Sequence, residues 1–158
     1  MSFSSSTGLV ALLGRPNVGK SSLFNKLTRS RKALVKDQPG VTRDVAIEPA
    51  DWWGQAFRLA DMGGLTSDQT GFSPLIKEKV LGFLKEADLL VVIFDGKSGM
   101  LPEDRDILLA AHESGKPFVC VVNKVDKFQD ADLLLSEFYE MGVDLIPAAF
   151  EKDYNIDL

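Results

Sequence analysis

A glycine-rich segment near the N-terminus has the residue types that bind phosphate groups. Residues 14–21 read GRPNVGKS and match the pattern G-x-x-x-x-G-K-[ST]. They follow the apolar run 8–13 and open a helix-like segment at 20–29. In that setting backbone N–H groups converge on a phosphate at a helix N-terminus, whose dipole favours anions. We therefore predict that Lys20 reaches the β- and γ-phosphates of a nucleotide and that Ser21 binds Mg²⁺. The predicted contacts in this loop are Gly14, Arg15, Pro16, Asn17, Val18, Gly19, Lys20, Ser21 and Ser22.

A second motif, Asn123-Lys124-Val125-Asp126, has the chemistry to read a nucleotide base. It follows the apolar run 118–122 and would lie at the carboxyl edge of a parallel sheet, where ligands bind in open α/β folds. A carboxylate there can accept both the N1–H and the N2–H₂ of guanine, and adenine offers no such pair of donors. A site built on such bonds rejects a base that leaves them unmade. We therefore predict guanine binding by Asn123, Lys124 and Asp126.

Two further segments could sense a γ-phosphate. Asp61 and Gly64 form a D-x-x-G pattern, in which Asp61 can hold Mg²⁺ through a water and the Gly64 N–H can bond the γ-phosphate. That bond exists only in the triphosphate state and would make the segment a switch. In the loop 30–43, Thr42 could give Mg²⁺ a second hydroxyl and contact the γ-phosphate. An apolar residue, Leu65, stands where a hydrolase could carry a polar group to hold water.

Short apolar runs alternate with helix-like segments, a rhythm typical of a parallel α/β sheet. We predict a phosphate-loop NTPase with six strands, mostly parallel, helices on both faces and one antiparallel edge strand formed by a hairpin. The expected strands are 8–13, 45–50, 55–60, 88–95, 118–122 and 143–146. The expected helices are 20–29, 73–86, 103–114 and 131–141.

Composition narrows the function classes. The chain has 158 residues, 45% of them hydrophobic, and a net charge of −5, which argues against a broad nucleic-acid-binding face. A single cysteine, Cys120, excludes an internal disulfide, and with one histidine it disfavours a zinc site. No segment approaches the ~18 apolar residues of a membrane span. We expect a cytoplasmic monomer without membrane contact or direct nucleic-acid binding.

The order of GRPNVGKSSLFNKL, PGVTRD, DMGGL and NKVD resembles the Era-like branch of translation-factor-type GTPases. Within that branch it is most similar to the first GTPase domain of the Der (EngA) family. The resemblance implies a Ras-like G domain that hydrolyses GTP to GDP slowly, with Mg²⁺ and with stimulation by K⁺. It also implies a switch in biogenesis of the large ribosomal subunit, with that subunit as partner of the full-length protein. Residues 1–158 would be one GTPase domain, lacking its last helix and the second GTPase and KH-like domains downstream.

The resemblance also assigns roles within the site. Family members carry a hydrophobic residue at the position of Leu65, and in several relatives an asparagine matching Asn17 helps to hold K⁺ near the phosphates. The implied catalytic residues are Lys20, Asn17, Thr42 and Gly64. The alternative for Asn17 is a loop-stabilising side chain. Arg15 is interpreted as a solvated charge on the phosphate side or a partner contact.

Two departures from the family pattern bear on function. Met62 stands where the family usually has threonine, so packing of the switch could differ. Ala148 and Ala149 occupy the fifth GTPase motif without its serine hydroxyl, which would weaken base affinity. One alternative is therefore a nucleotide-dependent binding module with negligible turnover. Another is a different Era-like GTPase, involved in tRNA modification or ribosome maturation.

Overall fold

The structure is a computed structural model that describes residues 7–28, 45–66 and 73–152. Its sheet contains β1 (Leu9–Leu13), β2 (Ala46–Trp52), β3 (Gln55–Asp61), β4 (Leu89–Asp95), β5 (Phe118–Asn123) and β6 (Leu145–Pro147). The strand order is β2-β3-β1-β4-β5-β6, and all pairs are parallel except β2 with β3. The predicted fold class is therefore confirmed, with β2 as the antiparallel edge strand. The predicted loop 30–43, with Thr42, lies outside the described residues, and the role of Thr42 stays a prediction.

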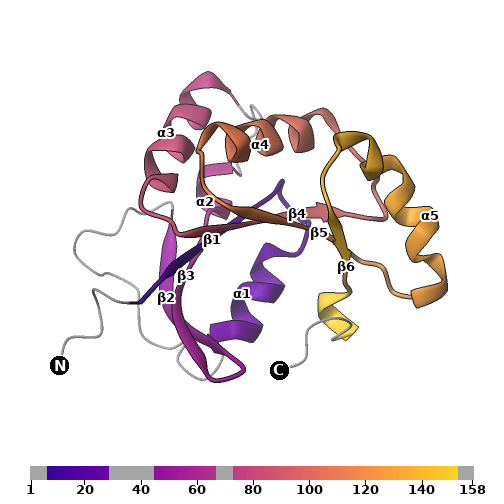
Figure 1. The fold of residues 1–158 in the computed structure, drawn as a ribbon, viewed down its shortest axis with the longest axis horizontal. Coiled ribbons are helices and arrows are strands. Elements are labelled where there is room, and N and C mark those ends of the chain that lie inside the picture. The colour runs from indigo at the N-terminus through magenta and orange to yellow at the C-terminus, as the bar shows by residue number, and fades with distance from the viewer. Residues whose placement is uncertain (1–6, 29–44, 67–72, 153–158) are drawn as a thin grey trace.

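Helices pack on both faces of the sheet. The α-helices are α1 (Lys20–Thr28), α2 (Gly63–Thr66), α3 (Pro74–Leu84), α4 (Pro102–Glu113) and α5 (Ala131–Leu135). The 3₁₀ helices are η2 (Phe128–Asp130), η3 (Ser136–Met141) and η4 (Phe150–Lys152). In Figure 1, α1 lies below the sheet and α3 and α4 lie above it. Helix α3 begins as its sequence predicts, because Ser73 Oγ accepts the Ile76 N–H at 3.2 Å and Pro74 occupies the first turn.

The two faces of the sheet bury separate hydrophobic clusters. On the side of α3 and α4, side chains such as Leu90, Phe94 and Phe138 form the larger cluster, and the two phenyl rings lie 5.3 Å apart. On the side of α1, Leu12, Leu23 and Phe150 belong to the smaller one. Together the clusters fix the strands, and thereby the loops at their carboxyl ends, where the site is built.

The structure differs from the predicted elements at two places. Residues 63–66 form the short helix α2, which was not among the predicted helices, and its Leu65 is buried against the larger cluster. The expected helix 131–141 is split into α5 and η3. At the junction Ser136 Oγ donates to the Leu133 carbonyl at 2.7 Å, a side-chain bond that competes with the helical ladder.

Candidate functional site

The phosphate loop makes a tight turn between β1 and α1. A Cβ atom on Gly14 would lie 2.7 Å from the Ile93 carbonyl oxygen and 2.8 Å from Val18 Cγ2, so no larger residue fits there. Asn17 and Gly19 both have positive φ, at 69° and 112°. Asparagine is among the few residues that adopt the left-handed region readily, and the Gly19 conformation requires glycine. The loop sequence is thus matched to its backbone, residue by residue.

Lys20 is the buried cation of this loop. Its ammonium group donates to the carbonyl oxygens of Gly14 at 2.6 Å and Arg15 at 2.7 Å. Burial lowers the pKa of Lys20 to about 8, although the nearby Asp61 carboxylate acts in the opposite direction. An anion placed beside this ammonium would favour its charged form, so the environment of Lys20 suits a phosphate group.

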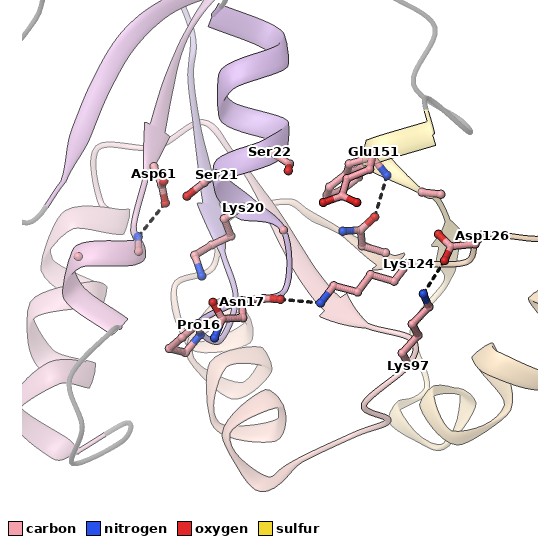
Figure 2. Close-up of a pocket in the computed structure, with 16 residues that line it drawn as sticks. Pro16, Asn17, Lys20, Ser21, Ser22, Asp61, Lys97, Lys124, Asp126 and Glu151 are labelled. Carbon is pink, nitrogen blue, oxygen red and sulfur yellow. Dashed lines mark hydrogen bonds and ion pairs between the residues drawn. The ribbon is translucent and has the colours of Figure 1, made fainter.

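The oxygen atoms of Ser21 and Asp61 line the same cavity as Lys20, as Figure 2 shows. Asp61 Oδ1 accepts the Gly63 N–H at 2.8 Å, which orients the carboxylate and starts α2. Among the described residues no cluster of three or more His, Cys, Asp or Glu could hold a metal ion by itself. Mg²⁺ at nucleotide sites is commonly bound by few protein oxygens together with phosphates and waters. The hydroxyl and the carboxylate fit that kind of site.

Asn123, at the end of β5, links the phosphate loop to Phe150. Its side chain is buried and donates to the Val18 carbonyl at 2.9 Å, while its Oδ1 accepts the Phe150 N–H at 2.9 Å. A Cβ on Gly19 would collide with Nδ2 of the same side chain. Asn123 therefore joins three segments that are far apart in the sequence.

Lys124 makes a second link to the phosphate loop. Its ammonium donates to the Asn17 carbonyl at 2.8 Å and to Asp95 Oδ2 at 2.9 Å, and its φ is 69°. Burial favours the neutral acid of Asp95, but bonds from Lys124 and Ser98 hold its pKa below the ordinary value. The cation is thus fixed between the phosphate loop and the end of β4.

Asp126, the predicted base-reading residue, forms an ion pair with Lys97 through its Oδ2. The Lys97 ammonium, acting mainly through this hydrogen bond, lowers the pKa of Asp126. Figure 2 shows the pair at the opposite end of the site from Lys20 and Asp61.

These groups surround a cavity of about 830 Å³. The predicted site residues that line it are Pro16, Asn17, Gly19, Lys20, Ser21, Ser22, Asp61, Gly64, Asn123, Lys124, Asp126 and Ala149. The predicted residues Gly14, Arg15, Val18 and Ala148 are absent from its lining and are buried. Lining residues that the sequence reasoning missed are Gly63, Lys97, Phe150 and Glu151.

The interpretation of Arg15 as a solvated charge is wrong. Its Nε donates to Asp104 Oδ1 at 3.0 Å, and the residue is only 9% exposed. The side chain therefore points into the interior towards α4, and its main-chain carbonyl faces Lys20. Burial beside Asp104 could not be read from a loop of polar residues, because its partner stands 89 positions away.

None of the helices described in the structure combines the length and apolar character that a membrane crossing requires.

Comparison with known proteins relates this site to one family. Residues 9–124 match the family model described as 50S ribosome-binding GTPase. The chain is 40% identical to GTPase Der of Persephonella marina over 149 residues. The aligned region covers 93% of this chain and 33% of the relative. It is 44% identical over 146 residues to GTPase Der of a Sulfurihydrogenibium species, covering 90% of this chain and 33% of the relative. The chain thus spans about a third of the length of these curated relatives.

Solved structures show the same fold. Era of Aquifex aeolicus bound to GDP and AlF₄⁻ superposes with a TM-score of 0.71 at 27% identity, over 96% of this chain and 54% of that one. A probable GTP-binding protein, engB, gives a TM-score of 0.66 at 26% identity, over 94% and 92% of the two chains. These likenesses agree with the resemblance that the motifs indicated. Most of the motifs within the matched residues 9–124 lie around one cavity. The chain therefore belongs to the 50S ribosome-binding GTPase family.

Proposed function

We propose that this chain binds GTP and hydrolyses it to GDP and phosphate. The single observation that carries the proposal is the continuous cavity of about 830 Å³ that joins Lys20 at one end to Asp126 at the other. A guanine nucleotide requires a cation near its phosphates and a carboxylate near its base. Lys20 and Asp126 supply these groups at the carboxyl ends of the strands. The family to which the chain belongs supports the same activity.

Each end of the cavity has a distinct part in this proposal. Lys20 neutralises charge on the β- and γ-phosphates, and backbone N–H groups of the loop bind them at the start of α1. When bound, Mg²⁺ supplies charge neutralisation between the phosphates, and Ser21 and Asp61 are the described residues that would hold it. Gly64 donates its N–H to the γ-phosphate, and Thr42 is proposed to add a second hydroxyl. Asp126 accepts from guanine, while Asn123, Lys124 and Ala149 shape its pocket.

Guanine specificity has a direct test. Asp126→Asn should weaken GTP binding and strengthen binding of xanthosine triphosphate, because the 2-oxo group of xanthine needs a donor. The measurement is the affinity of the wild type and the variant for both nucleotides. An unchanged preference for GTP would show that Asp126 does not read the base.

Stimulation by K⁺ is a finer part of the proposal and depends on Asn17. Its side chain lines the cavity, but its positive φ of 69° gives asparagine a conformational reason to stand there as well. Asn17→Ala removes the amide and strains the loop. Asn17→Gly removes the amide as well, but glycine adopts a positive φ without strain. If Asn17 binds K⁺, both variants lose the difference in phosphate release between KCl and NaCl. Retained stimulation in Asn17→Gly would assign the residue to the loop alone.

A nucleotide-dependent binding module with negligible turnover is the second candidate. The observations that favour it are the burial of Met62 in the larger hydrophobic cluster, at a position where the resemblance implies threonine, and Ala148-Ala149 in place of a serine-containing fifth motif. Phosphate release from GTP in KCl separates the two functions. Turnover above a blank without protein supports the hydrolase, and nucleotide binding without turnover supports the module.

For the whole protein we propose a switch in large-subunit ribosome biogenesis in the cytoplasm. The support is the description of the family as 50S ribosome-binding and the similarity to GTPase Der. Cosedimentation of the full-length protein with large ribosomal subunits, compared in a non-hydrolysable GTP analogue and in GDP, tests it. Equal binding in both nucleotides would argue against a switch.

A further inference from the structure

Two segments that follow neighbouring strands are joined by a pair of opposed ion pairs. Strands β4 and β5 are parallel, with Asp95 in register with Asn123. Asp95 forms an ion pair with Lys124, the residue after Asn123, at 2.9 Å. Two residues further along both segments the charges are exchanged, because Lys97 supplies the cation and Asp126 the carboxylate. The end of β4 and the segment after it therefore contact both charged residues of the base motif.

Lys97 approaches Asp126 without using the whole of its carboxylate. The ammonium contacts Oδ2, and the Asp126 side chain is 29% exposed. An ionised carboxylate has about four lone-pair directions on its two oxygens. A base with two donors and the Lys97 ammonium can therefore bind the same carboxylate together.

The backbone that carries Lys97 is fixed from both sides. The Lys97 N–H donates to Asp95 Oδ1 at 2.8 Å, and the Ser98 hydroxyl donates to Asp95 Oδ2 at 2.8 Å. Further along, the Met100 N–H donates to Glu137 Oε2 at 3.1 Å. The Lys97 side chain thus starts from a position that several bonds define.

We propose that Lys97 is a positioning residue for base recognition, which holds the Asp126 carboxylate in the orientation that accepts the base. The inference rests on the proposed function of Asp126 as the residue that reads guanine. Lys97 itself need not contact the nucleotide.

The surrounding charges make Lys97 the dominant influence on Asp126. The cations that act on Asp126 are Lys97, Lys124 and Lys152, and the hydrogen bond from Lys97 is the largest contribution to its lowered pKa. Lys97 in turn faces the carboxylates of Asp126, Asp95 and Glu151. Guanine donates to the ionised carboxylate, so loss of Lys97 should reduce affinity most strongly under acidic conditions.

The variant that tests this is Lys97→Met, which keeps most of the aliphatic side chain and removes the charge. Because the pair is partly exposed, its removal should weaken GDP binding about three- to fivefold at neutral pH. Lys97→Arg should restore binding to near the wild-type value. Lys152→Met is the matched control, because it removes a nearby cation for which no bond to Asp126 is seen, and it should change affinity less than about twofold.

Two readouts separate positioning from a general structural effect. Between about pH 6 and about pH 4, the GDP affinity of Lys97→Met should decline at a higher pH than that of the wild type, because the variant lacks the hydrogen bond that is the main cause of the lowered pKa of Asp126. In an Asp126→Asn background, Lys97→Met should leave the affinity for xanthosine diphosphate unchanged, since no carboxylate remains to be held. Loss of xanthosine diphosphate binding there would mean that Lys97 contacts the nucleotide directly and would overturn the inference.

Failure of the inference is distinguishable from failure of the proposed function. If the wild type does not bind GDP, both fall. If the wild type binds GDP and Lys97→Met binds it equally or more tightly across the pH range, only the positioning role of Lys97 is overturned. Circular dichroism of each variant confirms that it is folded, as expected for a side chain that is 60% exposed.

Discussion

Arg15 of the phosphate loop and Asp104 of α4 form an ion pair in the interior, with Arg15 Nε donating to Asp104 Oδ1 at 3.0 Å. Their side chains are 11% and 0% exposed. The second oxygen of Asp104 accepts the Leu101 N–H at 2.8 Å at the start of α4. Burial raises the pKa of Asp104, although Arg15 and the Leu101 N–H oppose that shift. One buried carboxylate thus joins the phosphate loop to the helix beside it.

Removing the arginine should be costly, because it leaves Asp104 buried without its cation. We expect Arg15→Met to lower the free energy of unfolding by about 3 kcal/mol. The control is Arg105→Met in α4. Arg105 forms an exposed ion pair with Glu140, with 3.7 Å between the guanidinium nitrogen and the carboxylate oxygen. That change should cost less than about 1 kcal/mol. Urea denaturation measures both, and equal effects would show that the buried pair adds nothing.

Met62 stands where the resemblance implies threonine, and its surroundings accommodate an apolar side chain. It is fully buried and packs in the larger hydrophobic cluster with Leu65 and Val80. Its N–H donates to the Leu12 carbonyl at 3.2 Å, which continues the pairing of β3 with β1. An apolar side chain therefore anchors the segment between β3 and α2.

Met62→Thr should lower the free energy of unfolding by about 2 to 3 kcal/mol, since it removes buried apolar volume and adds a hydroxyl to the core. Met62→Leu conserves volume and should cost less than about 1.5 kcal/mol. Chemical denaturation of both variants is the measurement. A threonine variant as stable as the wild type would mean that the cluster adapts to the residue usual in the family.

The sequence carried enough information to predict the sheet and most of the site because those signals are local. The phosphate loop is one uninterrupted sequence motif, and its glycines are required by the backbone conformation of the loop itself. Each strand is a short apolar run. Lys97 and Arg15 were missed or misread for the opposite reason. Each is a common surface residue type, and its role comes from a carboxylate that only the fold brings near. The 3₁₀ turn at Phe150 likewise depends on a distant partner, because its N–H bonds Asn123.

Gly19 should be intolerant of any side chain. Its φ is 112°, and an added Cβ would collide with Asn123 Nδ2 and lie 3.2 Å from Phe150 Cδ2. We expect Gly19→Ala to lower the free energy of unfolding by about 2 to 3 kcal/mol through strain and a displaced Asn123. Gly82 in α3 has nothing within 4 Å of an added Cβ, so Gly82→Ala should raise it by about 0.5 to 1 kcal/mol. Thermal or urea unfolding distinguishes them, and effects of the same sign would contradict the geometry.

Cys120, buried in β5, should make stability depend on pH in the alkaline range. The residue is 1% exposed, and burial raises the pKa of its thiol from 9.0 to about 11. The folded state therefore keeps the proton over a range in which the unfolded state releases it. The resulting stabilisation is fully present below about pH 9 and is lost as the pH rises towards about 11. Between about pH 8 and about pH 10 the free energy of unfolding should fall by about 1 kcal/mol more in the wild type than in Cys120→Ala. Urea denaturation at both pH values measures this difference, in which other titrating groups cancel. Parallel slopes for the two proteins would show that the thiol titrates normally in the folded state.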